Sequence, residues 1–467
     1  MEFSALVLAT TPHAGIAIAG LVARERAARV AKRVGARNVV TLTSTSPAAW
    51  REALASIPTG EGVLWLRADE LVHTPLVAPM MTALAENGRG AVSAYVVAPE
   101  QPVAPDVVAG AYAGAAFLTP ADVGTLRNLI ESEAAMPNRE TGDAPGLLVA
   151  RVEERLLAHL RAGAALAVPH GEIARHPLRD RAERRAAHRL LYRILIKTQD
   201  NAITKYLYRP VSFPLTVLFS KTPITPNQIS YLTGLIVAIG LWFTVKGTMP
   251  SAIIGTALVL EASHVDCCDG EIARLKLLSS KFGAWLDTVI DEFSALGYMV
   301  ALGIHCHLYF GPHWRGSTFS VLGLDMWLAL ASIGAIGYLL SIYFVYFNII
   351  VVVGSANSQD YVGEFEVIPS DAANAVRLRP AAKQAIAADN LPPALRWLAT
   401  YLPYVIRRDF VSWAALAFAF AHLTYISFAL QAVGGVVTAV IVGRDHVKLR
   451  RQLGEIRRSG KLLQRAA

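Results

Sequence analysis

The sequence predicts an α-helical integral membrane bundle of six transmembrane helices, preceded by a soluble α/β domain. Of the 467 residues, 54% are hydrophobic and only 17% are charged, whereas soluble domains are about 25% charged. All of the runs that we predict as membrane spans begin at or after Thr222, so the chain divides near that residue. The three cysteines are too few and too unevenly placed for a disulfide framework or a zinc ribbon.

Residues 1–174 are expected to form the soluble domain. Short apolar runs typical of buried strands alternate with alanine-rich helical stretches such as Gly20–Val34. This alternation predicts a mostly parallel sheet covered by helices. No positive patch precedes a long apolar run at the N-terminus, so we expect no signal peptide and a cytoplasmic domain. The strand-like runs are Ala5–Ala9, Val39–Leu42, Gly62–Leu66 and Ala91–Val97.

Residues 175–224 are predicted to form a basic amphipathic segment beside the membrane. Within it, 175–205 contains nine Lys or Arg and three acids, with apolar residues at helical spacing. A helix at the lipid headgroups fits this pattern, and a solvated linker helix is the alternative. The net charge of +8 could also indicate nucleic acid. Because no nucleic-acid-binding motif interleaves aromatic residues with these bases, we expect no nucleic-acid partner.

Residues 225–443 are expected to cross the membrane six times. The uncharged run Phe410–Gly443 is 34 residues long, which predicts two short helices hinged near Tyr425. The tail 444–467 has eight Lys or Arg against two acids. Positive flanks stay cytoplasmic, so we expect both the tail and the N-terminal domain on the cytoplasmic side of the cell membrane. The four earlier spans are predicted at Thr222–Val245, Met249–Val265, Phe293–His307 and Met326–Val353.

Four aspartates gather between the second and third predicted spans. Helical spacing places Asp266 and Asp269 on one face of a first helix, and Asp287 and Asp291 on one face of a second helix. Acids at membrane ends normally face a wet cavity and have a function. All-oxygen ligands suit Mg²⁺ or Mn²⁺, and a pair of such ions can hold a pyrophosphate for an in-line displacement. Small residues nearby would let a nucleotide approach the backbone: Gly270, Ala273 and Gly283.

The aspartates stand in the pattern D-x-x-D-G-x-x-A-R, eight residues, G-x-x-x-D-x-x-x-D. This pattern resembles the signature of the CDP-alcohol phosphotransferases at every fixed position, and the resemblance extends over about residues 201–443. It includes Thr225-Pro226-Asn227, which is similar to that family's motif before the first span. The resemblance implies transfer of a phosphoalcohol from a CDP-alcohol to a hydroxyl, with release of CMP, inside a six-helix bundle.

The resemblance also implies roles for individual residues. Asp266, Asp269 and Asp287 would hold two Mg²⁺ or Mn²⁺ ions, and Asp291 would be a general base that also borders a metal. A carboxylate beside two cations stays ionised. Asp291 would therefore act as a base through its alignment with the acceptor hydroxyl and not through a raised pKa. A structural ion site or an ion-transport path is the alternative for the four acids. The CDP site would be lined by Gly270, Ala273, Arg274, Gly283 and Asn227; a salt bridge to Asp269 or Asp291 is the alternative for Arg274.

The acceptor site is less well marked. Four basic residues near predicted cytoplasmic ends of spans could bind an acceptor phosphate, but ordinary positive flanks explain them equally well. Homodimers are common in the resembled family, so we expect a homodimer. The four residues are Arg209, Lys281, Arg407 and Arg408.

The order of elements in residues 1–174 resembles a nucleotidyltransferase domain, with Asp69 where such enzymes place a metal-binding aspartate. The glycine-rich loop with an Arg and a Lys that should follow Leu8 is missing. We therefore expect a degenerate domain with a structural or regulatory role, dispensable for chemistry; unspecific α/β patterning is the alternative.

The pairing of both halves resembles the inositol-phosphate cytidylyltransferase and di-myo-inositol phosphate phosphate synthase arrangement, which implies a polyol phosphate, inositol phosphate among them, as a substrate. Two other hypotheses remain open. In one, both halves are active and the chain makes its own CDP-alcohol from CTP. In the other, the protein is an ion carrier that uses its four Asp residues.

Overall fold

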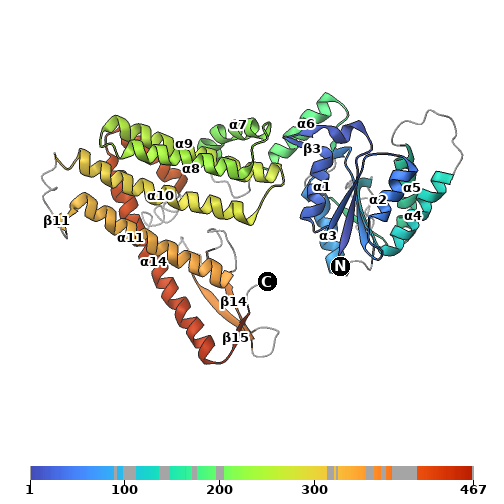
Figure 1. Cartoon of the computed structure of the whole chain (residues 1–467). Coiled ribbons are helices and arrows are strands. Elements are labelled where there is room, and N and C mark those ends of the chain that lie inside the picture. Colours follow the sequence, from blue (N-terminus) through green and yellow to red (C-terminus); the bar gives the residue numbers. More distant parts are fainter. Residues whose placement is uncertain are drawn as a thin grey trace, which may run out of the picture. The chain divides into compact units, whose positions relative to one another are not determined.

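The structure is a computed structural model with two compact units (Figure 1). The first unit contains Met1–Thr198 together with the short segments Ser220–Pro223 and Arg274–Leu277. The second contains Gln199–Phe219, Ile224–Ala273 and Leu278–Ala467. The residues described are 2–88, 92–97, 112–135, 147–163, 165–170, 176–195, 204–312, 320–321, 324–353, 361–369, 375–380 and 408–464.

A six-stranded sheet forms the centre of the first unit. The four predicted apolar runs each coincide with one of its strands, and its other two strands were not among the predicted runs. Three of the strand pairs are parallel, but β8 runs antiparallel to both of its neighbours, β5 and β7. The sheet is therefore mixed, and the expectation of a mostly parallel sheet needs this correction. In sheet order the strands are β4 (Asn38–Leu42), β1 (Phe3–Leu8), β5 (Gly62–Arg67), β8 (Tyr112–Leu118), β7 (Ala94–Val97) and β9 (Leu166–Pro169).

Helices cover both faces of this sheet, as the alternating pattern predicts (Figure 1). One hydrophobic cluster joins α1 and α3 to the sheet, and a second joins α2, α4 and α5 to the opposite face, where Trp50 stacks on Trp65. Burial of these apolar faces is the main force that holds the layers together. The helices are α1 (Ala23–Arg33), α2 (Pro47–Ala55), α3 (Thr74–Glu86), α4 (Pro120–Ala135) and α5 (Leu147–Ala162).

The predicted basic helix is present as α6 (Arg181–Arg193), in the first unit. It begins with a capping box, in which Asp180 and Glu183 each bond to the other's backbone N–H. Ala187 and Leu191 are buried along one face. Short elements complete the described part of this unit: a 3-10 turn at Pro12–Gly15, β2 (Ala17–Ile18), β3 (Leu21–Val22), β6 (Glu70–Leu71) and β10 (His176–Pro177).

The second unit consists mainly of long apolar helices. Among the described residues, four helical segments are long and apolar enough to cross a membrane: Met249–Leu275, Lys281–Tyr309, Met326–Val353 and Thr424–Arg458. Such helices indicate an integral membrane protein, while six crossings remain a prediction. The elements are η2 (Thr204–Tyr208), α7 (Arg209–Ser220), α8 (Pro226–Thr244), α9 (Met249–Leu275), α10 (Lys281–Tyr309), β11 (Ser320–Val321), β12 (Leu324–Asp325), α11 (Met326–Phe347), η4 (Asn348–Val353), α13 (Arg408–Phe420) and α14 (Thr424–Arg458).

The predicted break in the last apolar run is confirmed, because α13 ends at Phe420 and α14 begins at Thr424. His422 between them adopts a left-handed backbone, with φ of 63°. The expectation that both helices are short is wrong for α14, which has 35 residues and continues past Gly443 to Arg458.

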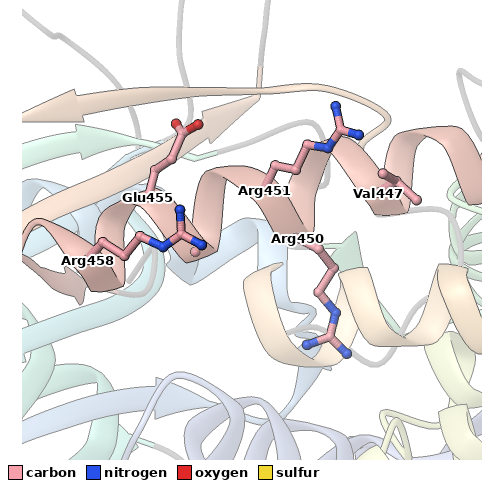
Figure 2. Close-up of a pocket in the computed structure, with 6 residues that line it drawn as sticks. Val447, Arg450, Arg451, Glu455 and Arg458 are labelled. Carbon is pink, nitrogen blue, oxygen red and sulfur yellow. The ribbon is translucent and has the colours of Figure 1, made fainter.

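A small sheet explains why α14 continues. Strands β13 (Phe365–Pro369), β14 (Ala375–Pro380) and β15 (Leu462–Gln464) form it, and Leu449 and Ile456 of α14 pack against its apolar face. A groove of about 370 Å³ follows this end of α14, where Arg450 and Arg451 point to opposite sides of the helix (Figure 2). The guanidinium of Arg450 lies 4.1 Å from the centre of the Phe347 ring.

Candidate active site

Three of the four predicted aspartates converge between α9 and α10. Asp266 and Asp269 lie one turn apart on α9, and Asp287 lies on α10. Each offers a carboxylate oxygen, and these oxygens all lie within 4.8 Å of one another. Because carboxylates so close repel one another, and oxygen ligands suit hard divalent cations, this group fits a metal site. Among the described residues, Asp291 lies outside the 4.8 Å group, one turn further along α10.

Helix α8 supports the centre of this group. Asp269 is only 8% exposed, and the hydroxyl of Ser230 donates a hydrogen bond of 2.5 Å to its Oδ2. Ser230 itself is buried. A hydrogen bond to an ionised carboxylate stabilises the charged form and fixes its orientation. Sequence reasoning missed Ser230. Because it lies four residues after Pro226, it shares a face of α8 with Pro226 of the predicted motif, and this spacing was the available signal.

The start of α8 lies beside the start of α10. Thr225 caps α8 through a capping box with Gln228, and Pro226 occupies the first turn, where its missing N–H costs nothing. A Cβ added at Gly283 would lie 2.9 Å from Oδ1 of Asn227. The structure thus brings together two residues predicted for the CDP site, and a side chain at position 283 would require Asn227 to shift.

The remaining residues predicted for the CDP site follow the aspartates on α9. Gly270, Ala273 and Arg274 are all half-buried. Their contact with a nucleotide stays a prediction. Helix α10 is held to α11 by Glu292, which accepts hydrogen bonds from the hydroxyls of Tyr338 at 2.6 Å and Tyr346 at 3.2 Å.

The four candidate acceptor residues do not form a described cluster. Arg209 on α7 forms an ion pair with Glu271, a buried residue that also accepts a 2.5 Å hydrogen bond from Thr216. Lys281 is exposed at the first residue of α10. Arg407 and the side chain of Arg408 lie outside the described residues. Sequence reasoning missed Glu271, and its charge directly after Gly270 was the available signal.

Asp69, the predicted metal-binding residue of the α/β domain, forms an ion pair with an arginine of the same chain. Arg67 donates to both carboxylate oxygens of Asp69, with Nε to Oδ1 at 3.0 Å, and to Glu153 at 3.0 Å. Glu153 also accepts from the indole of Trp65 at 3.2 Å. Burial lowers the pKa of Arg67, but hydrogen bonds and charge from Asp69 and Glu153 outweigh it and raise the pKa above its ordinary value. The guanidinium of Arg67 therefore binds the carboxylate oxygens of Asp69 that a metal ion would otherwise use.

Comparison with known proteins gives matches to parts of the chain. Residues 223–365 match the CDP-alcohol phosphatidyltransferase family. A bifunctional IPC transferase and DIPP synthase of Aquifex aeolicus is 34% identical over 106 residues, which are 23% of this chain and 24% of that protein. Proteins of the same description match from Rubrobacter xylanophilus, 33% identical over 20% of this chain and 21% of its own, and from Thermococcus kodakarensis, 31% identical over 24% and 25%. The matched regions thus span about a quarter or less of these relatives.

Proposed function

We propose, from the match of residues 223–365 to the CDP-alcohol phosphatidyltransferase family, that the chain transfers a phosphoalcohol from a CDP-alcohol to an acceptor hydroxyl and releases CMP. One observation carries the proposal: Asp266, Asp269 and Asp287 present oxygens within 4.8 Å of one another from two facing helices. The relatives are described as IPC transferases and DIPP synthases. We therefore propose a polyol phosphate, for example inositol phosphate, as one substrate.

In the proposed mechanism, Asp266, Asp269 and Asp287 would hold two Mg²⁺ or Mn²⁺ ions, and Asp291, one turn further along α10, would border them. When bound, the ions neutralise the pyrophosphate and the leaving group. Asp291 takes the proton of the acceptor hydroxyl while the hydroxyl oxygen attacks the phosphorus that carries the donor alcohol. The bond from that phosphorus to the bridging oxygen breaks, and CMP leaves with the bridging oxygen. The backbone and side chains that would line the CDP moiety are those of Gly270, Ala273, Arg274, Gly283 and Asn227.

We further propose that α8 and α13 add two crossings to the four long apolar segments, with both chain termini in the cytoplasm. At 1.5 Å per residue, the 19 residues of α8 extend about 28 Å, close to the hydrocarbon thickness of a bilayer. The homodimer rests on the resemblance alone. Labelling of single cysteines at exposed positions in intact and opened cells tests the topology, and the mass of the detergent-solubilised protein tests the dimer.

The direct test of function uses purified full-length protein in lipid nanodiscs, with Mg²⁺, a panel of CDP-alcohols and a panel of polyol phosphates and lipid alcohols. Mass spectrometry should find CMP and one product, which identifies donor and acceptor together. An ion carrier would release no CMP with any pair of substrates. Such a result, from protein shown to be folded, would overturn the proposal.

The α/β domain is proposed to be catalytically degenerate, because Arg67 already occupies the predicted metal position at Asp69. The competing hypothesis is a domain that makes a CDP-alcohol from CTP. Full-length Asp266→Asn protein, which should not consume a CDP-alcohol, can be incubated with CTP, Mg²⁺ and polyol phosphates. We expect no pyrophosphate release. Release of pyrophosphate with a matching CDP-alcohol would establish a bifunctional enzyme.

Arg67→Met should destabilise the α/β domain. The side chains of Asp69 and Glu153 are only 14% and 7% exposed, so the variant would leave two buried carboxylates without their cation. Breaking a buried pair in this way costs about 3 kcal/mol or more, which is about 6 to 12 °C in Tm for a unit of this size. Calorimetry of the detergent-solubilised protein measures the shift. Arg51→Met, at an exposed position on α2, is the control and should change Tm little.

A further inference from the structure

The helix that contains Asp266 and Asp269 ends in an unusual way. The N–H of Leu278 donates to the carbonyl of Ala273 at 2.9 Å, and the N–H of Leu277 donates to that of Arg274 at 3.4 Å. This is the Schellman pattern, whose left-handed residue is usually glycine. Here it is Leu277, with φ of 55°. A leucine in this conformation costs about 1 to 2 kcal/mol, so other contacts must hold the helix end.

Those contacts come from within the first compact unit, to which Arg274–Leu277 belong. The side chain of Leu277 packs against the hydrophobic cluster that joins α1 and α3 to the sheet. The carbonyl of Leu275 accepts a 2.6 Å hydrogen bond from Nη1 of Arg26, and the carbonyl of Lys276 accepts one of 2.7 Å from Arg29. A helix leaves its last four carbonyls without partners in the helix, and two of these four are taken by arginines of α1.

Arg26 is held rigidly. It is fully buried, and its second amino group donates to the carbonyl of Ile18 at 2.8 Å. Burial, and then the charge of Arg29, lowers the pKa of Arg26 to about 10, so the guanidinium remains charged at neutral pH. A positive charge at a helix C-terminus interacts favourably with the helix dipole. Burying a charge is costly, and in the described part of the chain the charge of Arg26 is compensated by these two carbonyl contacts.

We propose that Arg26, assisted by Arg29, is a positioning residue that caps the motif helix and so fixes Arg274, the residue directly before Leu275, for binding of the donor's phosphates. The proposal rests on the proposed transferase function. It gives the α/β domain a role in donor binding that does not need nucleotidyl transfer of its own. The domain would then not be fully dispensable for the reaction, contrary to the expectation from sequence.

The test compares full-length Arg26→Met and Arg26→Lys with Arg24→Met, which changes an exposed arginine of the same helix. In Arg26→Met the amides of Leu277 and Leu278 should exchange hydrogen for deuterium faster. The KM for the CDP-alcohol should rise about 10-fold or more, as expected for loss of a charged hydrogen bond, with a smaller change in kcat. Arg26→Lys should lie between, because an ammonium is not a planar fork that spans two carbonyls.

The outcomes separate the two proposals. If wild-type protein releases no CMP, the transferase function fails, while amide exchange still tests the cap. If wild type is active, and Arg26→Met matches Arg24→Met in both exchange and KM, the positioning role is overturned. Should Arg26→Met fail to fold, Arg29→Met decides, because this side chain is 27% exposed and easier to replace. It should show the same changes at smaller size, and unchanged exchange and KM would again overturn the role.

Discussion

Asp269→Asn is expected to lower CMP release by at least about 100-fold and to abolish the protection that Mg²⁺ or Mn²⁺ gives against heat. Asp269 is the most buried of the three clustered carboxylates and the one that Ser230 orients. Asparagine keeps the shape but removes a charge from an all-oxygen site, where the number of charged ligands sets affinity. Even changes around a ligand cost 10- to 100-fold in metal affinity or activity, so loss of the ligand should cost more.

The matched control is Glu261→Gln, the same change of acid to amide on the same helix at a residue whose side chain is 55% exposed. It should leave metal dependence unchanged. Ser230→Ala should fall between control and Asp269→Asn, because it removes the hydrogen bond and keeps the ligand. Titration of CMP release with Mn²⁺ after EDTA treatment compares all variants. Full activity of wild type in EDTA, or of Asp269→Asn at ordinary Mg²⁺, would rule out the metal site.

Much of the fold follows from local patterns in the sequence. The runs at Ala5–Ala9 and Gly62–Leu66 are strands because they are short, apolar and bounded by turn residues, and both lie in the central sheet. The direction of β8 could not be predicted, since strand direction depends on which distant strands pair. The extension of α14 past Gly443 was hidden in the same way. Its Leu449 and Ile456 read as isolated apolar residues in a basic tail until β13 and β14, far along the chain, cover them.

The site was predictable where spacing fixes geometry. Asp266, Asp269 and Asp287 converge because helical periodicity determines which residues share a face. Their supports were not predictable. A serine in an apolar helix, such as Ser230, usually signals packing, and only the fold shows that it faces Asp269. Likewise, the charge of Arg209 fitted a phosphate site and a positive membrane flank equally well. In the structure, Arg209 on α7 forms an ion pair with Glu271.

Asp291→Asn should separate the proposed base from the metal ligands. Asp291 lies one turn beyond Asp287 on α10 but outside the group of oxygens that lie within 4.8 Å, so it can border the ions and still face an acceptor. Asparagine keeps the size of the side chain and cannot take a proton. Loss of a general base costs about 10² to 10⁴ in rate, so kcat should fall by that order while affinity for the CDP-alcohol and Mn²⁺ changes little.

The contrast with neighbouring acids makes this test specific. Asp287→Asn should lose metal and nucleotide binding together with turnover. Glu292→Gln is the matched control, because Glu292 adjoins Asp291. The glutamine oxygen can still accept from one of the hydroxyls of Tyr338 and Tyr346, and its NH₂ group can donate to the other; its kcat should stay within a few-fold of wild type. Isothermal titration with a CDP-alcohol and single-turnover CMP release measure binding and chemistry separately. If Asp291→Asn loses binding as completely as Asp287→Asn, Asp291 is a ligand, and the proton must pass to another group, such as a phosphate oxygen of the substrate.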